Sequence, residues 1–353
     1  MAPVLKAADA AMLPCYLETP FSQTLPFYRK LGYEATSEPR PFTGAPQLWA
    51  TTRKAEAGTM TMVGIVESLW RFPVKSMRGE QLGETAVTGR GVLGDRAYAL
   101  IDTDTGRVVS AKSAKLYPNI LNCGAKFVEP PRSDADMPPV HISLPDGTVL
   151  RSDATDVDRA LSAYFRRNVA LRRSAPEDFT VDQYHPDVEG ADPAGNRDAV
   201  VPQKLGSALF ASLEMESPLP VGSFLDVFPV SVLTSSTLAK LTRQQPQSRF
   251  DVRRFRMNVI LKTESDGFVE NEWIGHTLGF GETTRLSVAL HDPRCVMVTL
   301  AQDDLPRDTD ILKALVRDNR VQLGDLGAFP CAGVYAVVAA SGAIRVGAKV
   351  GLN

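Results

Sequence analysis

Apolar positions along the chain recur mostly at the spacing of β-strands. Apolar runs rich in β-branched residues are bounded by Pro, Gly, Asn or Asp, which end strands and form turns. These runs predict strands at 62–72, 97–102, 107–110, 140–144, 148–150, 227–233, 255–262, 286–290 and 296–300. Turn residues at 103–106, 145–147 and 341–342 predict hairpins.

Three segments have apolar residues at helical spacing instead. One helix is expected to begin at Thr155, with an apolar stripe from Val157 to Phe165. Two more are expected to begin at 234–236 and near 308–309. Strands dominate, and no strand–helix alternation, heptad or internal repeat is present. We therefore predict a mainly β fold with some α (α+β).

The two β-rich regions are expected at 61–175 and 223–353, since 353 residues allow two domains with an appendage. Between them, 176–222 is rich in Pro, Gly and Asp and contains an ambiguous apolar patch at 205–213. We interpret 176–222 as a long connection, a kind of segment that is usually functional or mobile.

Residues 1–60 differ in style from the rest of the chain. Short strands are predicted at 14–19, 33–35 and 48–52, and a helix at 23–31 is expected to end at Gly32. The segment 55–59 has the composition of a linker.

The charge and cysteine content exclude several classes of protein. The net charge of −2 gives no overall attraction to nucleic acid or to an anionic membrane. The longest uncharged run, 326–344, is interrupted by Gly and Pro and does not resemble a membrane span. The four cysteines are far apart and form no Cys-x-x-Cys pair, which argues against a zinc or iron–sulfur site. We expect a soluble cytoplasmic protein with no nucleic-acid or membrane partner.

Two turns after predicted strands carry candidate anion-binding residues. In Phe72-Pro73-Val74-Lys75-Ser76, Pro73 ends the strand and presents Lys75 and Ser76, which suit a phosphate or another anion. A solvated turn lysine is the alternative. In Gly91-Val92-Leu93-Gly94-Asp95-Arg96, an aspartate can hold Arg96 in place for a ligand. A purely structural ion pair is the alternative there.

The run Arg253-Arg254-Phe255-Arg256-Met257-Asn258 is predicted to be part of the strand at 255–262. Strand alternation places Arg254, Arg256 and Asn258 on one face, either as a pocket wall for a polyanion or as an ordinary solvent-exposed face.

Cys295, in His291-Asp292-Pro293-Arg294-Cys295, is the candidate reactive thiol. The adjacent Arg294 favours a thiolate, the form that attacks or binds a metal. A buried structural thiol is the alternative, and Cys331, with no charged neighbour, fits that description better.

Together these motifs resemble the MOSC family, the molybdenum-cofactor sulfurase C-terminal domain, from about Thr61 to the C-terminus. The first two resemble the N-terminal β-barrel domain of that family, and the arginine and cysteine motifs resemble the MOSC domain itself. The chain is similar in particular to the amidoxime-reducing members of the family. The resemblance implies a MOSC-type β-barrel at 223–353 preceded by a β-barrel-like domain at 61–175.

The resemblance also implies a site and a cofactor. A molybdenum cofactor (molybdenum–molybdopterin) is expected, with Cys295 as catalytic residue and metal ligand. The residues expected to hold the cofactor are Lys75, Ser76, Arg96, Thr234, Ser235, Arg256, Asn258 and Arg294. No PLP, haem, flavin or iron–sulfur site is predicted.

The implied function is an oxidoreductase that removes oxygen from small N-hydroxylated or N-oxide substrates. Its electrons would come from a separate reductase or ferredoxin, since the chain lacks the Cys spacing of a ferredoxin module. The alternative is a sulfur or cofactor carrier with a persulfide on Cys295.

Residues 1–60 resemble the C-terminal third of a GNAT N-acetyltransferase, on the residues Leu17-Glu18-Thr19, 26–33 and Leu48-Trp49. The loop that binds acetyl-CoA in that family has no counterpart here, so acetyl transfer is not expected. A fusion remnant and a misplaced chain start both remain open.

Overall fold

The computed structural model describes residues 5, 8, 14–38, 47–53 and 60–353. The linker predicted at 55–59 lies outside these residues.

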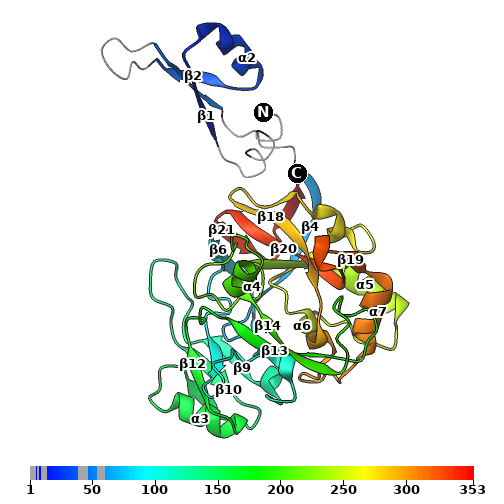
Figure 1. Ribbon diagram of the computed structural model, residues 1–353. Coiled ribbons are helices and arrows are strands. Elements are labelled where there is room, and N and C mark those ends of the chain that lie inside the picture. The colour runs from blue at the N-terminus through cyan, green and yellow to red at the C-terminus, as the bar shows by residue number, and fades with distance from the viewer. Residues whose placement is uncertain (1–4, 6–7, 9–13, 39–46, 54–59) are drawn as a thin grey trace.

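A closed barrel of seven strands forms the centre of the fold (Figure 1). Its strands, in order around the ring, are β15 (Val230–Thr234), β16 (Val259–Lys262), β4 (Thr61–Arg71), β22 (Lys349–Leu352), β17 (Thr277–Phe280), β18 (Thr284–Pro293) and β20 (Ala328–Ala340). Pairing of β20 with β15 closes the ring, and only β15 and β16 are parallel. The inward positions are apolar, among them Leu69, Val232 and Leu286, and this alternation is why the segments form strands.

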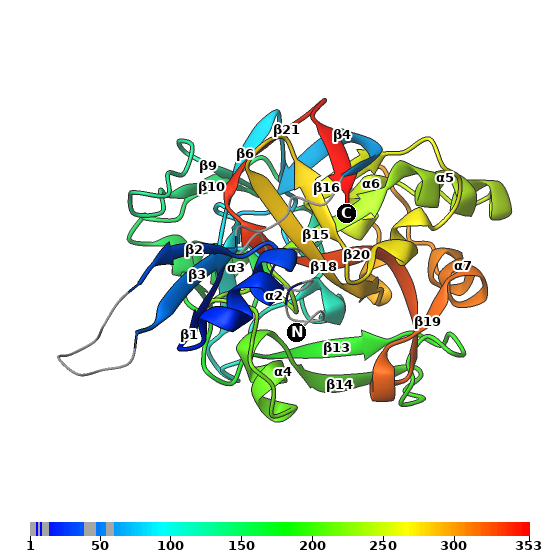
Figure 2. The same ribbon diagram turned by 90° about the horizontal axis from the view of Figure 1, so that it is seen from above.

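Further elements extend and cover the barrel. Strands β5 (Glu80–Leu82) and β19 (Arg320–Gln322) pair with β4 and β20, and β21 (Gly342–Arg345), β6 (Glu84–Thr88) and β7 (Gly91–Val92) form a small sheet. Helices α5 (Ser235–Gln244) and α7 (Asp310–Asp318) lie on one side of the barrel (Figure 2). The predicted inner face of α7 is confirmed, because Ile311, Leu312 and Leu315 are buried.

A second lobe has its own core. It comprises β8 (Ala99–Asp102), β9 (Gly124–Phe127), β10 (Val140–Ser143), β11 (Val149–Arg151), α3 (Val157–Phe165) and β12 (Val169–Arg172). The two predicted regions interlock, because β4 belongs to the barrel and β6 pairs with β21. The boundary between 61–175 and 223–353 is therefore crossed by strand pairing.

The segment 176–222 contains regular structure. Strands β13 (Thr180–His185) and β14 (Ala199–Lys204) form an antiparallel hairpin, and the ambiguous apolar patch is helix α4 (Gly206–Ser212). Figure 2 shows this hairpin along one edge of the molecule. The polar, turn-rich stretches of the segment lie in the loop between the two strands and in the irregular residues before β13 and after α4.

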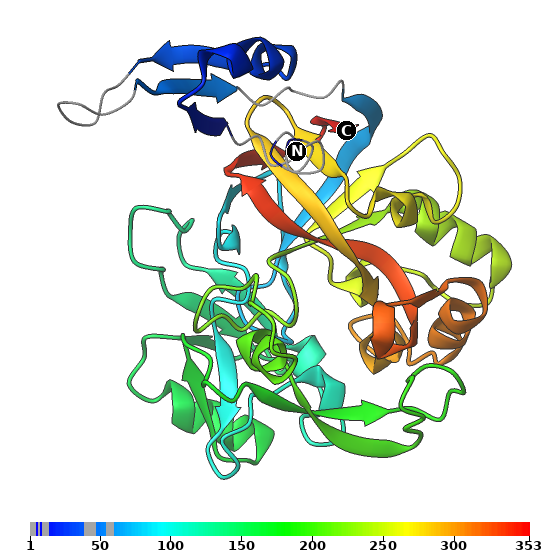
Figure 3. The same cartoon turned by 45° about the horizontal axis from the view of Figure 1, so that its top comes forward.

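Near the N-terminus, β1 (Cys15–Thr19), β3 (Trp49–Arg53) and β2 (Glu34–Ser37) form a three-stranded sheet with α2 (Leu25–Lys30). This sheet lies outside the barrel in Figures 1 and 3. Gly32 follows α2 with φ of +84°, as expected for the end of a helix. Single-turn 3₁₀ helices occur at η1 (Ser22–Thr24), η2 (Ala111–Ser113), η3 (Ile120–Asn122), η4 (Val269–Trp273), η5 (Val296–Thr299) and η6 (Gly324–Leu326).

Several predicted elements are wrong in detail. The strand predicted at 296–300 is the 3₁₀ helix η5, whose apolar residues Val296 and Val298 enter two different cores. The strand at 255–262 is divided into a short helix, α6 (Val252–Phe255), and β16. Apolar runs indicate burial but not always an extended backbone, and the buried residues within 252–255 and 296–299 lie in helical turns.

The hairpin predicted at 341–342 is also wrong, because β21 pairs with β6 and not with β20. The N-cap position of α3 is Asp156, one position after the predicted Thr155, and its side chain makes no capping hydrogen bond. Residues 107–110 make only an isolated bridge to Ile101.

Candidate functional site

A cavity of about 330 Å³ lies where turns of both lobes meet the β13–β14 hairpin. Of the residues predicted for the site, seven line the cavity: Lys75, Ser76, Arg96, Arg256, Asn258, Arg294 and Cys295. They come from four separate stretches of the sequence, so the tertiary fold brings together motifs that are up to 220 positions apart.

Two lysines share one carboxylate at the cavity. Lys75 is buried, forms an ion pair with Asp226 and donates a hydrogen bond to the carbonyl of Phe224 at 2.9 Å. Lys112, in η2, contacts the other oxygen of Asp226 at 2.8 Å. The Ser76 hydroxyl accepts a hydrogen bond from the amide of Ala111 at 2.9 Å, which ties the two lysine segments together. Lys75 is therefore not a solvated turn residue.

The ionisation of this cluster reflects its burial. Burial lowers the pKa of Lys75 to about 8, even though Asp226 opposes the shift. Burial alone would raise the pKa of Asp226, but Lys112 and Lys75 hold it well below its usual range. Two buried cations and one carboxylate leave an excess positive charge, which a bound anion would balance.

A second pair of cations lies over the ring of Phe72. The guanidinium carbons of Arg96 and Arg256 are 4.5 and 4.3 Å from the ring centroid. Arg96 pairs with Asp95, which also accepts hydrogen bonds from the Phe72 amide at 2.8 Å and from the Asn258 side chain at 2.9 Å. The Asp95–Arg96 pair is thus structural as well as part of the cavity wall.

Arg256 is a buried cation of the cavity wall that has no carboxylate partner among the described residues. Its guanidinium donates to the carbonyl of Met77 at 2.8 Å, and among the described residues it forms no ion pair. Burial, then the charge of Arg96, lowers its pKa. A buried guanidinium without its own carboxylate is expensive unless a ligand compensates it.

Cys295 lies at the end of β18, half-buried in the cavity wall. The neighbouring Arg294 pairs with Asp292. Burial lowers the pKa of the nearby Lys112, but Asp226 and, to a smaller extent, Cys295 raise it above its usual value. Burial raises the pKa of Asp292 to about 6, although Arg294 opposes this. Within the described part of the chain, Asp292 Oδ1 and Arg294 Nε are buried and lack hydrogen-bond partners.

Thr234 and Ser235 are not brought to the cavity. Thr234 caps α5 by accepting the Thr237 amide at 3.2 Å and donates to the buried Glu270 at 2.6 Å. Ser235 lies 3.4 Å from the carbonyl of Leu261. Their place in the sequence, just after a barrel strand, is explained by helix capping.

Glu270 gives a test of this assignment. Burial raises its pKa, so its ionisation destabilises the folded state progressively as the pH rises through that raised pKa. We expect Glu270→Gln to unfold at a higher temperature than the wild type at pH 8, with the difference shrinking toward pH 4. Thermal unfolding followed by circular dichroism at both pH values measures this. A variant that is less stable at pH 8 would contradict it.

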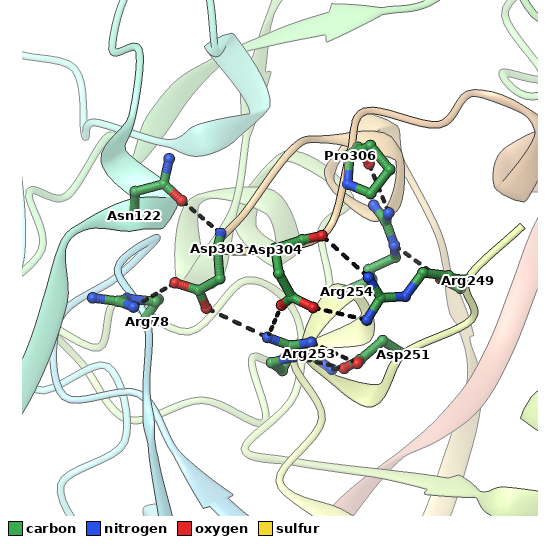
Figure 4. A network of polar contacts seen from close by, with 9 residues as sticks. All are labelled: Arg78, Asn122, Arg249, Asp251, Arg253, Arg254, Asp303, Asp304 and Pro306. Carbon is green, nitrogen blue, oxygen red and sulfur yellow. Dashed lines mark hydrogen bonds and ion pairs between the residues drawn. The ribbon is translucent and has the colours of Figure 1, made fainter. Parts of the chain in front are cut away.

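Arg254 does not share a face with Arg256. It is fully buried and donates hydrogen bonds to four carbonyls, those of Arg249, Val298, Leu300 and Pro306, at 2.7 to 3.2 Å. Figure 4 shows the bonds to Arg249 and Pro306. The prediction that placed both arginines on one strand face is wrong, because residues 252–255 are helical and Arg256 has a left-handed φ of 55°.

The network in Figure 4 fixes the loop that follows Cys295. The carboxylate of Asp303 pairs with Arg78, and its backbone amide donates a hydrogen bond to the side chain of Asn122 at 2.8 Å. Arg253 contacts Asp251 and Asp304 at 2.7 and 2.9 Å. These contacts tie the loop at residues 303–304 to both lobes.

The sequence analysis did not single out Lys112, Asp226 or Asp292 as site residues. It also did not find the residues of the β13–β14 hairpin that line the cavity. One signal was available: Lys112-Ser113 repeats the Lys75-Ser76 pair, each after an apolar residue. Asp226 lies in an irregular loop, and no local pattern distinguishes it from the many other aspartates.

The comparisons with known families agree with this architecture. Residues 63–165 match the family described as the MOSC N-terminal beta barrel domain, and residues 221–351 match the MOSC domain. The chain therefore belongs to the MOSC family and carries both domains.

Its relatives include two human proteins. Human "Mitochondrial amidoxime reducing component 2" is 24% identical over 310 residues, 82% of this chain and 84% of the relative. Human "Mitochondrial amidoxime-reducing component 1" is 22% identical over 328 residues, 86% of each protein.

Among solved structures, the YUAD protein from Bacillus subtilis aligns with a TM-score of 0.37 and 11% identity, over 82% of this chain and 96% of that one. YiiM from Geobacillus stearothermophilus aligns with a TM-score of 0.25 and 18% identity, over 36% and 54%. These scores are too low to support an argument.

The GNAT resemblance of residues 1–60 is not confirmed by the family matches, which begin at residue 63, and stays a prediction. In the described residues, no group of three or more His, Cys, Asp and Glu side chains could hold a metal ion. In the same residues, no helix has the length and apolarity to cross a membrane.

Proposed function

We propose that this protein is a molybdenum-cofactor-binding oxidoreductase that reduces N-hydroxylated or N-oxide substrates. The observation that carries the proposal is the combination, in one cavity, of a half-buried thiol and buried cations that exceed their internal carboxylates. The names of the two human relatives support the same reaction class.

The residues present fit a large anionic cofactor. Lys75 and Lys112 are buried and share one carboxylate, Asp226, and Arg256 is buried without an ion pair among the described residues. The Nε of Arg294 adds a donor that has no partner. Such an arrangement is costly without a bound anion and is suited to phosphate and pterin oxygens. Since no cluster of protein ligands is found in the described residues, the metal would depend on its cofactor and on one protein sulfur.

Each side chain then has a defined task. Cys295 offers a soft sulfur ligand to the metal. Lys75, Ser76, Lys112, Arg96 and Arg256 bind the anionic part of the cofactor, while Asn258 holds Asp95 and through it Arg96. When bound, the cofactor supplies the two electrons that remove the substrate oxygen. Burial of the cavity wall limits water and strengthens the hydrogen bonds made there.

The test is the composition and turnover of the purified protein. Protein produced in a host that makes the cofactor is expected to contain molybdenum and pterin and to reduce benzamidoxime with an artificial electron donor. Absence of both molybdenum and pterin would refute the proposal. A mass increase of one sulfur atom on Cys295 without turnover would instead identify a sulfur carrier.

Arg256 gives a residue-level test. Arg256→Ala is expected to weaken pterin retention by ~1.5–3 kcal/mol, the usual value of a hydrogen bond to a charged group. Pterin released during dialysis, measured by fluorescence, reports the change. Arg132→Ala, an exposed arginine paired with Asp134, is the control and should retain pterin normally. Unfolding of Arg256→Ala with unchanged loading per folded molecule would make the residue structural.

A further inference from the structure

The β13–β14 hairpin forms a wall of the cavity that has a different chemistry from the cationic part. Gln183 and His185 of β13, Asp192 and Asn196 of the connecting loop, and Gln203 of β14 line it. This segment lies between residues 165 and 221, outside both matched family domains. The cationic residues of the cavity, in contrast, all come from inside those domains: Lys75, Arg96 and Lys112 from the first, and Arg256 and Arg294 from the second.

The wall is held in one conformation by its own contacts. Asp192 accepts hydrogen bonds from the amide and the side chain of Asn196 at 3.0 and 2.6 Å, and lies 3.5 Å from Nδ1 of His185. The loop is anchored from outside, because Val188 is buried in the core formed with α7. A wall fixed in this way binds a ligand without a large ordering cost.

One polar atom of the wall lacks a partner. Oε1 of Gln203 is buried, and within the described residues it has no hydrogen bond. A buried acceptor without a partner destabilises the unliganded wall, so a ligand that donates a hydrogen bond there is favoured.

The charges beside this wall have both signs, so the hydrogen bond itself, and not a net charge, would select the ligand. Burial and then the positive charge of Lys112 lower the pKa of His185, while the negative charge of Asp192 opposes the shift. The hairpin's Arg197 and Lys204 pair with Asp187 and Asp178 and do not line the cavity.

The remaining neighbours of this wall are apolar. Leu205, Leu209 and Leu213 from α4 and its ends line the same cavity, together with Phe228. They provide a surface for the hydrocarbon part of a ligand.

We propose that the β13–β14 hairpin is the substrate-recognition wall, and that Gln203 determines specificity by accepting a hydrogen bond from an N–H-bearing head group on an apolar body. This inference rests on the proposed function, since it names how that site selects its substrate. It assigns to the hairpin a role separate from holding the cofactor.

Calorimetric titration of the purified full chain with benzamidine tests the inference without turnover. Benzamidine carries N–H donors on an aromatic ring, and benzoate has the same shape with acceptors only. We expect Gln203→Leu to weaken benzamidine binding at least tenfold and to leave any benzoate binding unchanged. Gln203→Glu should bind benzamidine as tightly as the wild type or more tightly, because it keeps an acceptor and adds negative charge.

Gln81→Leu is the matched control, since Gln81 is exposed on β5 and outside the cavity. Circular dichroism checks that each variant is folded. The inference is overturned if the wild type does not bind benzamidine, if Gln203→Leu binds it normally, or if benzoate shows the same dependence on Gln203.

The two proposals fail in different ways. Gln203-dependent benzamidine binding by a protein without molybdenum or turnover would refute the proposed function and retain the recognition wall. Normal molybdenum content and turnover with binding that ignores Gln203 would refute the recognition wall alone. In the loaded enzyme, Gln203→Leu should raise KM for benzamidoxime and change kcat little.

Discussion

Replacing Cys295 by Ser is expected to reduce benzamidoxime turnover to background, because a hydroxyl oxygen does not replace a soft thiolate as ligand to the metal. Pterin should be partly retained, since Lys75, Lys112 and Arg256 contact the cavity independently of the thiol. Activity normalised to bound molybdenum, with pterin measured separately, gives the result.

Cys331→Ser is the matched control for this change. Cys331 lies on β20, fully buried, and burial raises the pKa of its thiol to about 12. The substitution buries a hydroxyl and should lower the free energy of unfolding by ~1–3 kcal/mol while leaving turnover per loaded molecule near normal. Loss of turnover in Cys331→Ser with survival in Cys295→Ser would show that the wrong cysteine has been chosen.

The second large effect is expected at Arg254. Arg254→Ala leaves four carbonyl groups without their donor, two of them in the segment after Cys295, at Val298 and Leu300. We expect the free energy of unfolding to fall by ~3–5 kcal/mol, at the upper end for a single substitution, because a buried hydrogen-bond network is removed. Denaturant unfolding of wild type and variant measures this.

Arg249→Ala is the control for Arg254. Arg249 is exposed and pairs with Asp304 on the surface, so its loss should cost only ~0.2–1 kcal/mol. Equal effects of the two substitutions would show that the network in Figure 4 does not depend on the buried guanidinium.

The candidate site was largely predictable where its chemistry is local. The turn at Lys75, the Asp95–Arg96 pair and the Arg294–Cys295 pair each follow a strand, so a short stretch of sequence both ends the strand and presents the side chain. The MOSC resemblance rested on these stretches, and the family matches confirm it.

The rest depended on contacts between distant segments. Asp226 acquires its role from two lysines that are 151 and 114 positions away, and no pattern around it records them. Gln203 lies on β14, within the segment 176–222, and the composition of that segment indicated only a long connection. Thr234 was predicted for the cavity, yet a carboxylate 36 positions away holds it elsewhere.

The sequence by itself determined the predominance of strands, the amphipathic α7 and the motifs that identify the family, because periodicity and turn residues act over a few positions. Only the tertiary structure decided that Arg254 supports the backbone while Arg256, two positions later, faces the cavity. The physical reason is the change from helix to a left-handed residue at Arg256, which reverses the direction of neighbouring side chains. That change depends on where the barrel places the surrounding carbonyls, which local sequence does not specify.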